Sequence, residues 1–181
     1  IWNKLVQEHG AGMCISIDMD DLGIHGGVGT EAMDKRDLWF QERFSNCHFI
    51  RGDSHEVESV CKVETIIEPA FGIMMLNSNY STSDLVEKVQ QFDFLFIDGD
   101  HSYEGVKRDF EMYSPFVKKG GIIAFHDIVI SDRHHDRNVY VGEFWRDLTT
   151  VRMSDNPNIC LIDGKEVGMT EIIAGEDWGG I

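Results

Sequence analysis

Basic residues are scarce in this 181-residue chain. Lys and Arg total 16 against 32 Asp and Glu, which gives a formal net charge of −16 at pH 7. Nucleic acids and anionic membranes bind basic surfaces, so we expect neither as a partner. No apolar run approaches the roughly 20 residues of a membrane span, and we expect no signal peptide.

The cysteines lack any paired spacing or Cys-x-x-Cys motif. Two of them, Cys14 and Cys160, lie in apolar runs and are expected to be small core residues. This pattern favours a reduced, cytoplasmic protein. The four cysteines are Cys14, Cys47, Cys61 and Cys160.

The length suits one domain with a full hydrophobic core, and we predict a single domain over residues 1–181. The chain begins at Ile1 inside a helical pattern and stops at 179–181, Gly-Gly-Ile. We therefore expect it to be truncated at both ends.

Residues 92–128 organise the rest of the sequence. The nearly continuous apolar run at 92–97 predicts a strand buried on both faces. Apolar residues at steps of three and four over 103–117 predict a helix, ended by Lys-Lys-Gly-Gly at 118–121. A second buried strand is expected at 122–125.

Polar residues follow both of these strands. Two parallel strands joined by a helix end on one edge of a sheet, where open α/β sheets bind ligands. Clustered acids repel one another without a cation or partner, which indicates an active site rather than two turns. The residues are Asp98, Asp100, His101, His126 and Asp127.

Strands and helices alternate through the remaining sequence, which predicts a doubly wound α/β sheet. A polar loop is expected at 128–138, where the adjacent His134 and His135 would point apart and so not share a metal ion. Further strands are expected at 13–17, 47–50, 159–162, 170–174 and from 177, helices at 35–44, 57–63, 83–91 and 141–148, and an irregular insert at 64–80.

Three of the predicted strands end in an acid: Asp18, Asp53 and Asp98. A carboxylate accepts hydrogen bonds from both hydroxyls of a ribose, which suits Asp18. One strand further out, Asp53 and Ser54 can hydrogen-bond an adenine amino group. Asp98 can face the reacting end of a nucleotide-like cofactor.

The stretch FDFLFIDGDHSYEGVKRDFEMYSPFVKKGGIIAFHDI resembles the second half of class I S-adenosylmethionine-dependent methyltransferases. It is most similar to the branch of macrolide and rhamnosyl O-methyltransferases and cephalosporin-hydroxylase-like proteins, the methyltransferase domain 24 type. ISIDMD and FIRGDSHE match that family's second and third strand ends, and the resemblance covers most of residues 10–150. It implies a Rossmann-like sheet of seven strands, mostly parallel, with the last strand antiparallel.

The resemblance also implies residue roles. Asp18 would hold the ribose of S-adenosylmethionine, and Asp53 and Ser54 would lie by the adenine. His101 would act as the general base. A divalent ion, Mg²⁺ or Mn²⁺, would be bound by Asp98, His126 and Asp127.

The sequence departs from the family pattern in two places. The family's first strand and glycine loop would lie before Ile1 and are expected to be missing from this chain. His126 stands where the family has an acid. Because Mg²⁺ prefers oxygen ligands, His126 indicates a softer ion such as Mn²⁺ or Fe²⁺, or a supporting role.

The implied activity is O-methyl transfer to a hydroxylated small molecule such as a sugar or polyketide, and whether the chain forms a homo-oligomer stays open. Two alternatives stay open. One is a Rossmann-like cofactor-binding protein without methyl transfer. The other is a metal-dependent oxygenase or hydrolase, since Asp98, His126 and Asp127 have the composition of a facial triad.

Overall fold

The computed structural model describes residues 12–19, 29–44, 46–67 and 92–173. The chain divides into two compact units, Ile1–Val89 and Gln90–Ile181, and each is described by itself. The single domain over residues 1–181 stays a prediction.

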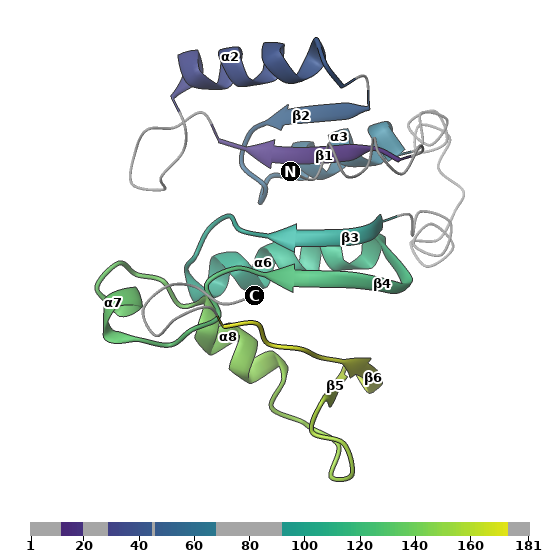
Figure 1. The fold of residues 1–181 in the computed structure, drawn as a ribbon, viewed down its shortest axis with the longest axis vertical. Coiled ribbons are helices and arrows are strands. Elements are labelled where there is room, and N and C mark those ends of the chain that lie inside the picture. Colours follow the sequence, from purple (N-terminus) through teal and green to yellow (C-terminus); the bar gives the residue numbers. More distant parts are fainter. Residues whose placement is uncertain (1–11, 20–28, 45, 68–91, 174–181) are drawn as a thin grey trace. The chain divides into compact units, whose positions relative to one another are not determined.

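The first unit contains two parallel strands, each followed by a helix (Figure 1). Strand β1 pairs with β2 from Cys14↔Cys47 through Asp18↔Arg51. The predicted strands and helices are confirmed here, with ends shifted by a few residues. The elements are β1 (Cys14–Asp18), α2 (Thr30–Gln41), β2 (Cys47–Arg51) and α3 (Val57–Ile67).

Helix α3 runs further than expected, because residues 64–67 continue it instead of starting an irregular insert. Val63 and Ile67, four residues apart, are both buried, so one apolar face extends through the last turn. The rest of the predicted insert and the predicted helix at 83–91 lie outside the described residues.

Helix α2 packs against β2 through aromatic side chains and buries one acid. The rings of Phe40 and Phe49 have centroids 5.4 Å apart, and Met33 is fully buried. Asp37, on the same helix, is only 8% exposed. A carboxylate this buried needs charged or hydrogen-bonding partners, and these are described with the site.

The second unit confirms the predicted strand, helix and strand. Strands β3 and β4 pair in parallel, from Phe94↔Ile122 through Ile97↔Phe125. Figure 1 shows α6 along one face of this pair. The elements are β3 (Phe92–Ile97), α6 (Tyr103–Tyr113), the short 3₁₀ helix η1 (Ser114–Phe116) and β4 (Val117–Phe125).

The predicted end of helix α6 is wrong. The helix stops at Tyr113, and residues 118–121 lie inside β4 instead of ending the helix. Pro115 follows in η1, and because proline lacks an N–H it cannot donate the next hydrogen bond of an α-helix. Gly120 lies within β4 and has φ +82°, a conformation that suits glycine.

One face of the β3–β4 pair carries the core of this unit. Ile97, Val106, Phe125 and Phe144 are buried together, with the partly buried Leu95 and Ile123 packed against them. On the opposite face, Phe94 is 38% exposed and Ile122 is 61% exposed. Burial on both faces was therefore a wrong prediction for these two positions.

The C-terminal part of this unit begins with two helices, α7 (Asp132–His135) and α8 (Val141–Leu148). Helix α7 lies within the stretch predicted to be a loop. An antiparallel hairpin follows, formed by β5 (Ile159–Ile162) and β6 (Lys165–Gly168). The predicted strand at 170–174 is wrong over residues 170–172, because β6 pairs with β5 instead.

The turn of this hairpin explains the missed strand. Asp163 and Gly164 both have positive φ, 50° and 74°, as the favoured two-residue hairpin turn requires. The Asp-Gly pair directly after the apolar run at 159–162 was therefore the available sequence signal.

The described strands form three two-stranded sheets. The βα units with parallel pairing agree in outline with a Rossmann-like α/β fold, and the antiparallel pairing occurs in the β5–β6 hairpin. Among the described residues, no helix has the length and apolar character needed to cross a bilayer.

Candidate functional site

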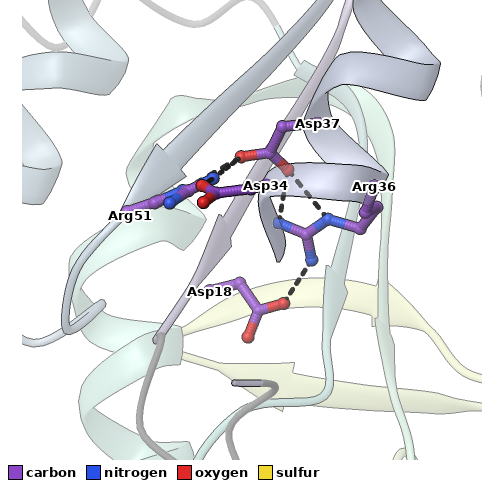
Figure 2. A network of polar contacts seen from close by, with 5 residues as sticks. All are labelled: Asp18, Asp34, Arg36, Asp37 and Arg51. Carbon is purple, nitrogen blue, oxygen red and sulfur yellow. Dashed lines mark hydrogen bonds and ion pairs between the residues drawn. The ribbon is translucent and has the colours of Figure 1, made fainter. Parts of the chain in front are cut away.

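Asp18, the predicted ribose-binding acid, is the last residue of β1. Its carboxylate Oδ2 accepts a hydrogen bond from Arg36 Nη1 at 2.5 Å (Figure 2). Asp18 and Arg51 are register partners at the ends of β1 and β2. Arg36 lies on helix α2, which connects these strands. The structure thus confirms the position of Asp18 at a strand end and adds a partner that the sequence did not reveal.

Asp53 and Ser54 lie in the turn between β2 and α3. Asp53 Oδ1 accepts from the backbone N–H of His55 at 2.8 Å, and the Asp53 carbonyl accepts from Ser59 Oγ at 2.6 Å. These bonds shape the turn, as an Asp side chain commonly does. The Asp53 side chain remains 45% exposed, so a role beside an adenine stays a prediction.

A hollow of about 860 Å³ lies along α2, β2 and α3 in the same unit. Its lining includes Asp34, Asp37 and Arg51, but not Asp18, Asp53 or Ser54. The hollow is wide open and mixed in polarity, and it is separate from the strand-end acids. We give it no role in cofactor binding.

In the second unit, the ends of β3 and β4 bring four predicted residues together. Because Ile97 and Phe125 are register partners, the residues that follow them leave the sheet side by side. One ligand atom from each side chain lies within 4.8 Å of all the others. The four residues are Asp98, His101, His126 and Asp127, here called the Asp–His cluster.

The distances within the Asp–His cluster are short. Asp98 Oδ1 lies 3.1 Å from His101 Nε2 and 3.3 Å from His126 Nδ1. Asp127 Oδ1 lies 3.1 Å from His126 Nδ1, and its Oδ2 lies 3.7 Å from His101 Nε2. Each imidazole therefore faces both carboxylates.

Asp127 reaches this position through an uncommon backbone conformation. Its φ is +58°, in the left-handed region that residues other than glycine adopt rarely and Asp more readily than most. Its side chain is only 16% exposed. Strained backbone of this kind clusters at functional sites, which agrees with a site at this residue.

One atom of the Asp–His cluster indicates a missing partner. His126 Nδ1 is buried and makes no hydrogen bond of acceptable geometry to any described residue, although two carboxylate oxygens lie within 3.3 Å. A cation among these groups would satisfy the nitrogen and offset the repulsion between the carboxylates. Two imidazoles and two carboxylates suit Mn²⁺, Fe²⁺ or Zn²⁺ better than Mg²⁺. The residues therefore fit a divalent ion.

His101 is poised to hold a proton. Its hydrogen bond to Asp98 is the main cause that raises the pKa of His101 above 6.5, with the charges of Asp127, Asp98 and Asp100 adding to it and partial burial opposing it. Ser102, not His101, caps helix α6 by accepting from the N–H of Gly105 at 3.0 Å. The side chain of His101 is thus directed to the cluster rather than to the helix end.

Asp100, the fifth polar residue predicted at this edge, does not join the Asp–His cluster. Its Oδ1 accepts from the backbone N–H of Ser102 at 2.8 Å. Its side chain packs against Gly105 so closely that a Cβ there would lie 2.2 Å from the Asp100 carboxyl carbon. Asp100 lies at the predicted strand-end edge, where it shapes the turn before α6 and its charge helps to raise the pKa of His101.

His134 approaches the cluster and was missed as a site residue. It is 8% exposed, with Nε2 at 3.9 Å from Asp127 Oδ1 and Nδ1 at 3.0 Å from Ser131 Oγ. His135 turns away, with Nε2 at 2.5 Å from Glu143 Oε1. The two histidines therefore point apart, as predicted. A signal for His134 was present in Ser131, which caps α7 three residues earlier.

Parallel βα units with acids at their strand ends are typical of α/β enzymes that bind nucleotide-like cofactors. Comparison with known families makes this specific, since the profile described as "Methyltransferase domain" matches residues 1–128. The chain therefore belongs to this methyltransferase domain family, and the domain is that of a class I S-adenosylmethionine-dependent methyltransferase.

Two similar proteins have been found, and both are uncharacterised. A protein of Acanthamoeba polyphaga mimivirus is 57% identical over 35 residues, which is 19% of this chain and 16% of that protein. One from Sinorhizobium fredii is 36% identical over 64 residues, covering 35% of this chain and 7% of that protein. The chain thus matches only a small part of either relative. No solved structure matches it.

Proposed function

We propose that this chain transfers the methyl group of S-adenosylmethionine to a hydroxyl oxygen of a small molecule, such as a sugar or polyketide, with the aid of a divalent ion. The methyltransferase family supports methyl transfer in general. The observation that carries the finer proposal is the Asp–His cluster, whose four ligand atoms lie within 4.8 Å of one another.

The ion would be held by Asp98, His126 and Asp127, as the family resemblance implies. A bound divalent cation lowers the pKa of a substrate hydroxyl and orients it. The carboxylates supply the negative charge that attracts the cation, and the buried His126 Nδ1 supplies a nitrogen donor with no other described hydrogen-bond partner. This mixed donor set favours Mn²⁺ or Fe²⁺ over Mg²⁺.

His101 would accept the proton of the substrate. The substrate oxygen would bond to the methyl carbon as the carbon–sulfur bond breaks, S-adenosylhomocysteine would leave, and the hydroxyl proton would pass to His101 Nε2. Asp98 beside this nitrogen raises its pKa, which makes His101 a stronger base. The enzyme contributes mainly by orienting the two reactants.

The cofactor would be recognised by the first unit. The ionised carboxylate of Asp18 suits the ribose hydroxyls, and Asp53 with Ser54 suits the adenine. The complete sheet would be the seven-stranded Rossmann-like one, with its last strand antiparallel.

His101 has a second possible role, because its Nε2 belongs to the same four-atom group and can serve as a metal ligand. Replacement by glutamine separates the two roles. His101→Gln that binds Mn²⁺ normally but loses most activity identifies a base. His101→Gln that loses Mn²⁺ identifies a ligand. His135→Gln is the matched control, since His135 pairs with Glu143 and lies outside the cluster.

The proposal is tested by titrating S-adenosylhomocysteine into the 181-residue chain by calorimetry, with and without Mn²⁺. Asp18→Ala should weaken binding by about 10- to 100-fold, because hydrogen bonds to a charged group contribute about 1.5–3 kcal/mol. Release of S-adenosylhomocysteine from a panel of hydroxylated acceptors then tests the reaction. Binding that Asp18→Ala leaves unchanged would remove the ribose assignment.

A further inference from the structure

Asp18 is not a lone carboxylate, because Arg36 holds one of its oxygens. Arg36 Nη1 donates to Asp18 Oδ2 at 2.5 Å, and Oδ1 has no hydrogen-bond partner in the part of the chain that the structure describes. A carboxylate offers about four acceptor positions, so one guanidinium contact leaves room for the hydroxyls of a ligand. The side chain of Asp18 is 31% exposed, which leaves this oxygen edge accessible.

Arg36 is itself fixed in place. Its Nε and Nη2 lie 3.0 and 2.9 Å from Asp37 Oδ1, and its guanidinium carbon lies 4.9 Å from the centroid of the Phe49 ring. A guanidinium is planar, so fixing one edge and one face also directs the remaining nitrogen. That nitrogen, Nη1, points at Asp18 (Figure 2).

Asp37 connects Arg36 to the end of the neighbouring strand. Its second oxygen, Oδ2, accepts from Arg51 Nε and Nη2 at 3.0 and 2.9 Å, and Arg51 also pairs with Asp34 at 2.7 Å. One continuous network thus joins the last residues of β1 and β2 through helix α2. Its five charged groups, three acids and two arginines, carry a net charge of −1.

We infer that Arg36 is a positioning residue for ribose recognition. It holds the Asp18 carboxylate in one orientation, so that a ribose meets an acceptor that is already ordered. The inference rests on the proposed function, in which Asp18 accepts from the ribose hydroxyls. Without Arg36, ligand binding would itself have to order this side chain, at a cost in entropy.

The test compares two ligands, S-adenosylhomocysteine and its 2′-deoxyribose analogue, by calorimetric titration into the full chain. Arg36→Met removes the guanidinium but keeps an unbranched stem over Phe49. It should weaken S-adenosylhomocysteine about tenfold, as expected for losing support of a charged hydrogen bond, and weaken the deoxy analogue less. In an Asp18→Asn background, Arg36→Met should cause no further loss.

Two further variants complete the experiment. Arg43→Met is the matched control, because Arg43 also stacks on an aromatic ring, at 4.5 Å from the Trp39 centroid, and pairs with the adjacent Glu42. No contact between Arg43 and Asp18 is found in the described structure. The Arg43→Met variant should therefore bind S-adenosylhomocysteine with the affinity of the wild type. Arg36→Lys keeps the charge but not the planar fork, and should restore part of the affinity. If thermal melting shows that Arg36→Met does not fold, Arg36→Lys is used in its place to compare the two ligands.

Four outcomes would overturn the inference alone. Arg36→Met could weaken both ligands equally, or add its full loss to that of Asp18→Asn, and either result would mean that it acts only on the stability of the unit. It could tighten binding, which would mean that the ribose must displace Arg36. It could leave binding unchanged while Asp18→Asn weakens it. If the wild type binds neither ligand, or Asp18→Asn has no effect, the ribose assignment fails and the inference falls with it.

Discussion

The two units place carboxylates at strand ends in the same way but surround them with different basic side chains. In the first unit Asp18 faces a guanidinium, Arg36, at 2.5 Å. In the second unit Asp98 and Asp127 face two imidazoles at 3.1–3.7 Å. The position of an acid at a strand end therefore does not decide its chemistry, and the neighbouring side chains do.

The difference follows from the chemistry of the two kinds of side chain. A guanidinium only donates hydrogen bonds and does not bind metals, so a carboxylate held by one can use its other oxygen to accept from neutral hydroxyls. An imidazole loses its proton near neutral pH and then binds metals or accepts protons. The first arrangement suits a ribose, and the second suits a metal ion and proton transfer.

The largest effect is expected at the Asp–His cluster. Asp127→Ala removes a carboxylate that faces both histidines, and should weaken Mn²⁺ binding by at least about 100-fold, beyond the 10- to 100-fold typical of supporting residues. Titration of Mn²⁺ followed by electron paramagnetic resonance measures this on the protein alone, without any substrate.

Asp18→Ala is the matched control for that experiment. It removes a strand-end carboxylate whose partner is an arginine, so Mn²⁺ affinity should stay at the wild-type value. Equal losses in both variants would break the comparison, because the two carboxylates would then behave alike.

A smaller effect is expected from Asp37→Asn in the arginine network. The change removes the charge of an 8%-exposed carboxylate that pairs with two arginines. We expect a loss of about 2 kcal/mol in the free energy of unfolding, near the lower part of the range for charged hydrogen bonds because both arginines are partly exposed. Urea denaturation followed by circular dichroism measures it.

Glu31→Gln provides the comparison for Asp37→Asn. Glu31 pairs with Lys35 on the same helix, but both side chains are highly exposed, so its effect should stay below about 0.5 kcal/mol. If Asp37→Asn were equally mild, the network would not be a fixed support for Asp18.

The smallest effect concerns pH in the metal-free protein. The pKa of His101 is raised above 6.5, mainly by its hydrogen bond to Asp98. The stabilisation from protonated His101 is therefore fully present below about pH 6.5 and is lost as the pH rises through the folded-state pKa. Wild type should exceed His101→Gln in stability by more at about pH 6 than at about pH 8.

This comparison is made by urea denaturation in the presence of a chelator. Arg36→Met is the matched comparison, because it removes an arginine instead of a histidine, and its difference from wild type should be the same at the two pH values. A His101 difference that grows with pH would contradict the direction of the shift.

Much of the candidate site could be predicted from the sequence. Apolar runs and the polar residues after them located the strands that end at Asp18, Ile97 and Phe125, because burial imposes a local pattern. The end of helix α6 just before Pro115 and the hairpin turn at Asp163 could also have been predicted from local rules, but the prediction relied on other residues.

The partners of the site residues could not be read in this way. Arg36 lies 18 residues from Asp18, and His134 lies seven residues beyond Asp127 in a stretch that looked like a loop. The charged side chains near each acid in the sequence give no sign of which one reaches it. The same limit applies to Asp100, whose carboxylate accepts from the Ser102 N–H and packs against Gly105 instead of joining the Asp–His cluster.

The sequence by itself determined which residues end the strands and the class of chemistry that they can perform, since both depend on hydrophobic pattern and side-chain type. Only the tertiary structure decided which arginine or histidine side chain lies beside which carboxylate. The β1–β2 register sets Arg51 beside Asp18, and α2 adds Arg36 and Asp37. The β3–β4 register sets His126 and Asp127 beside Asp98. Strand register is fixed by packing between segments that are distant in the sequence, and this packing cannot be predicted from a local pattern.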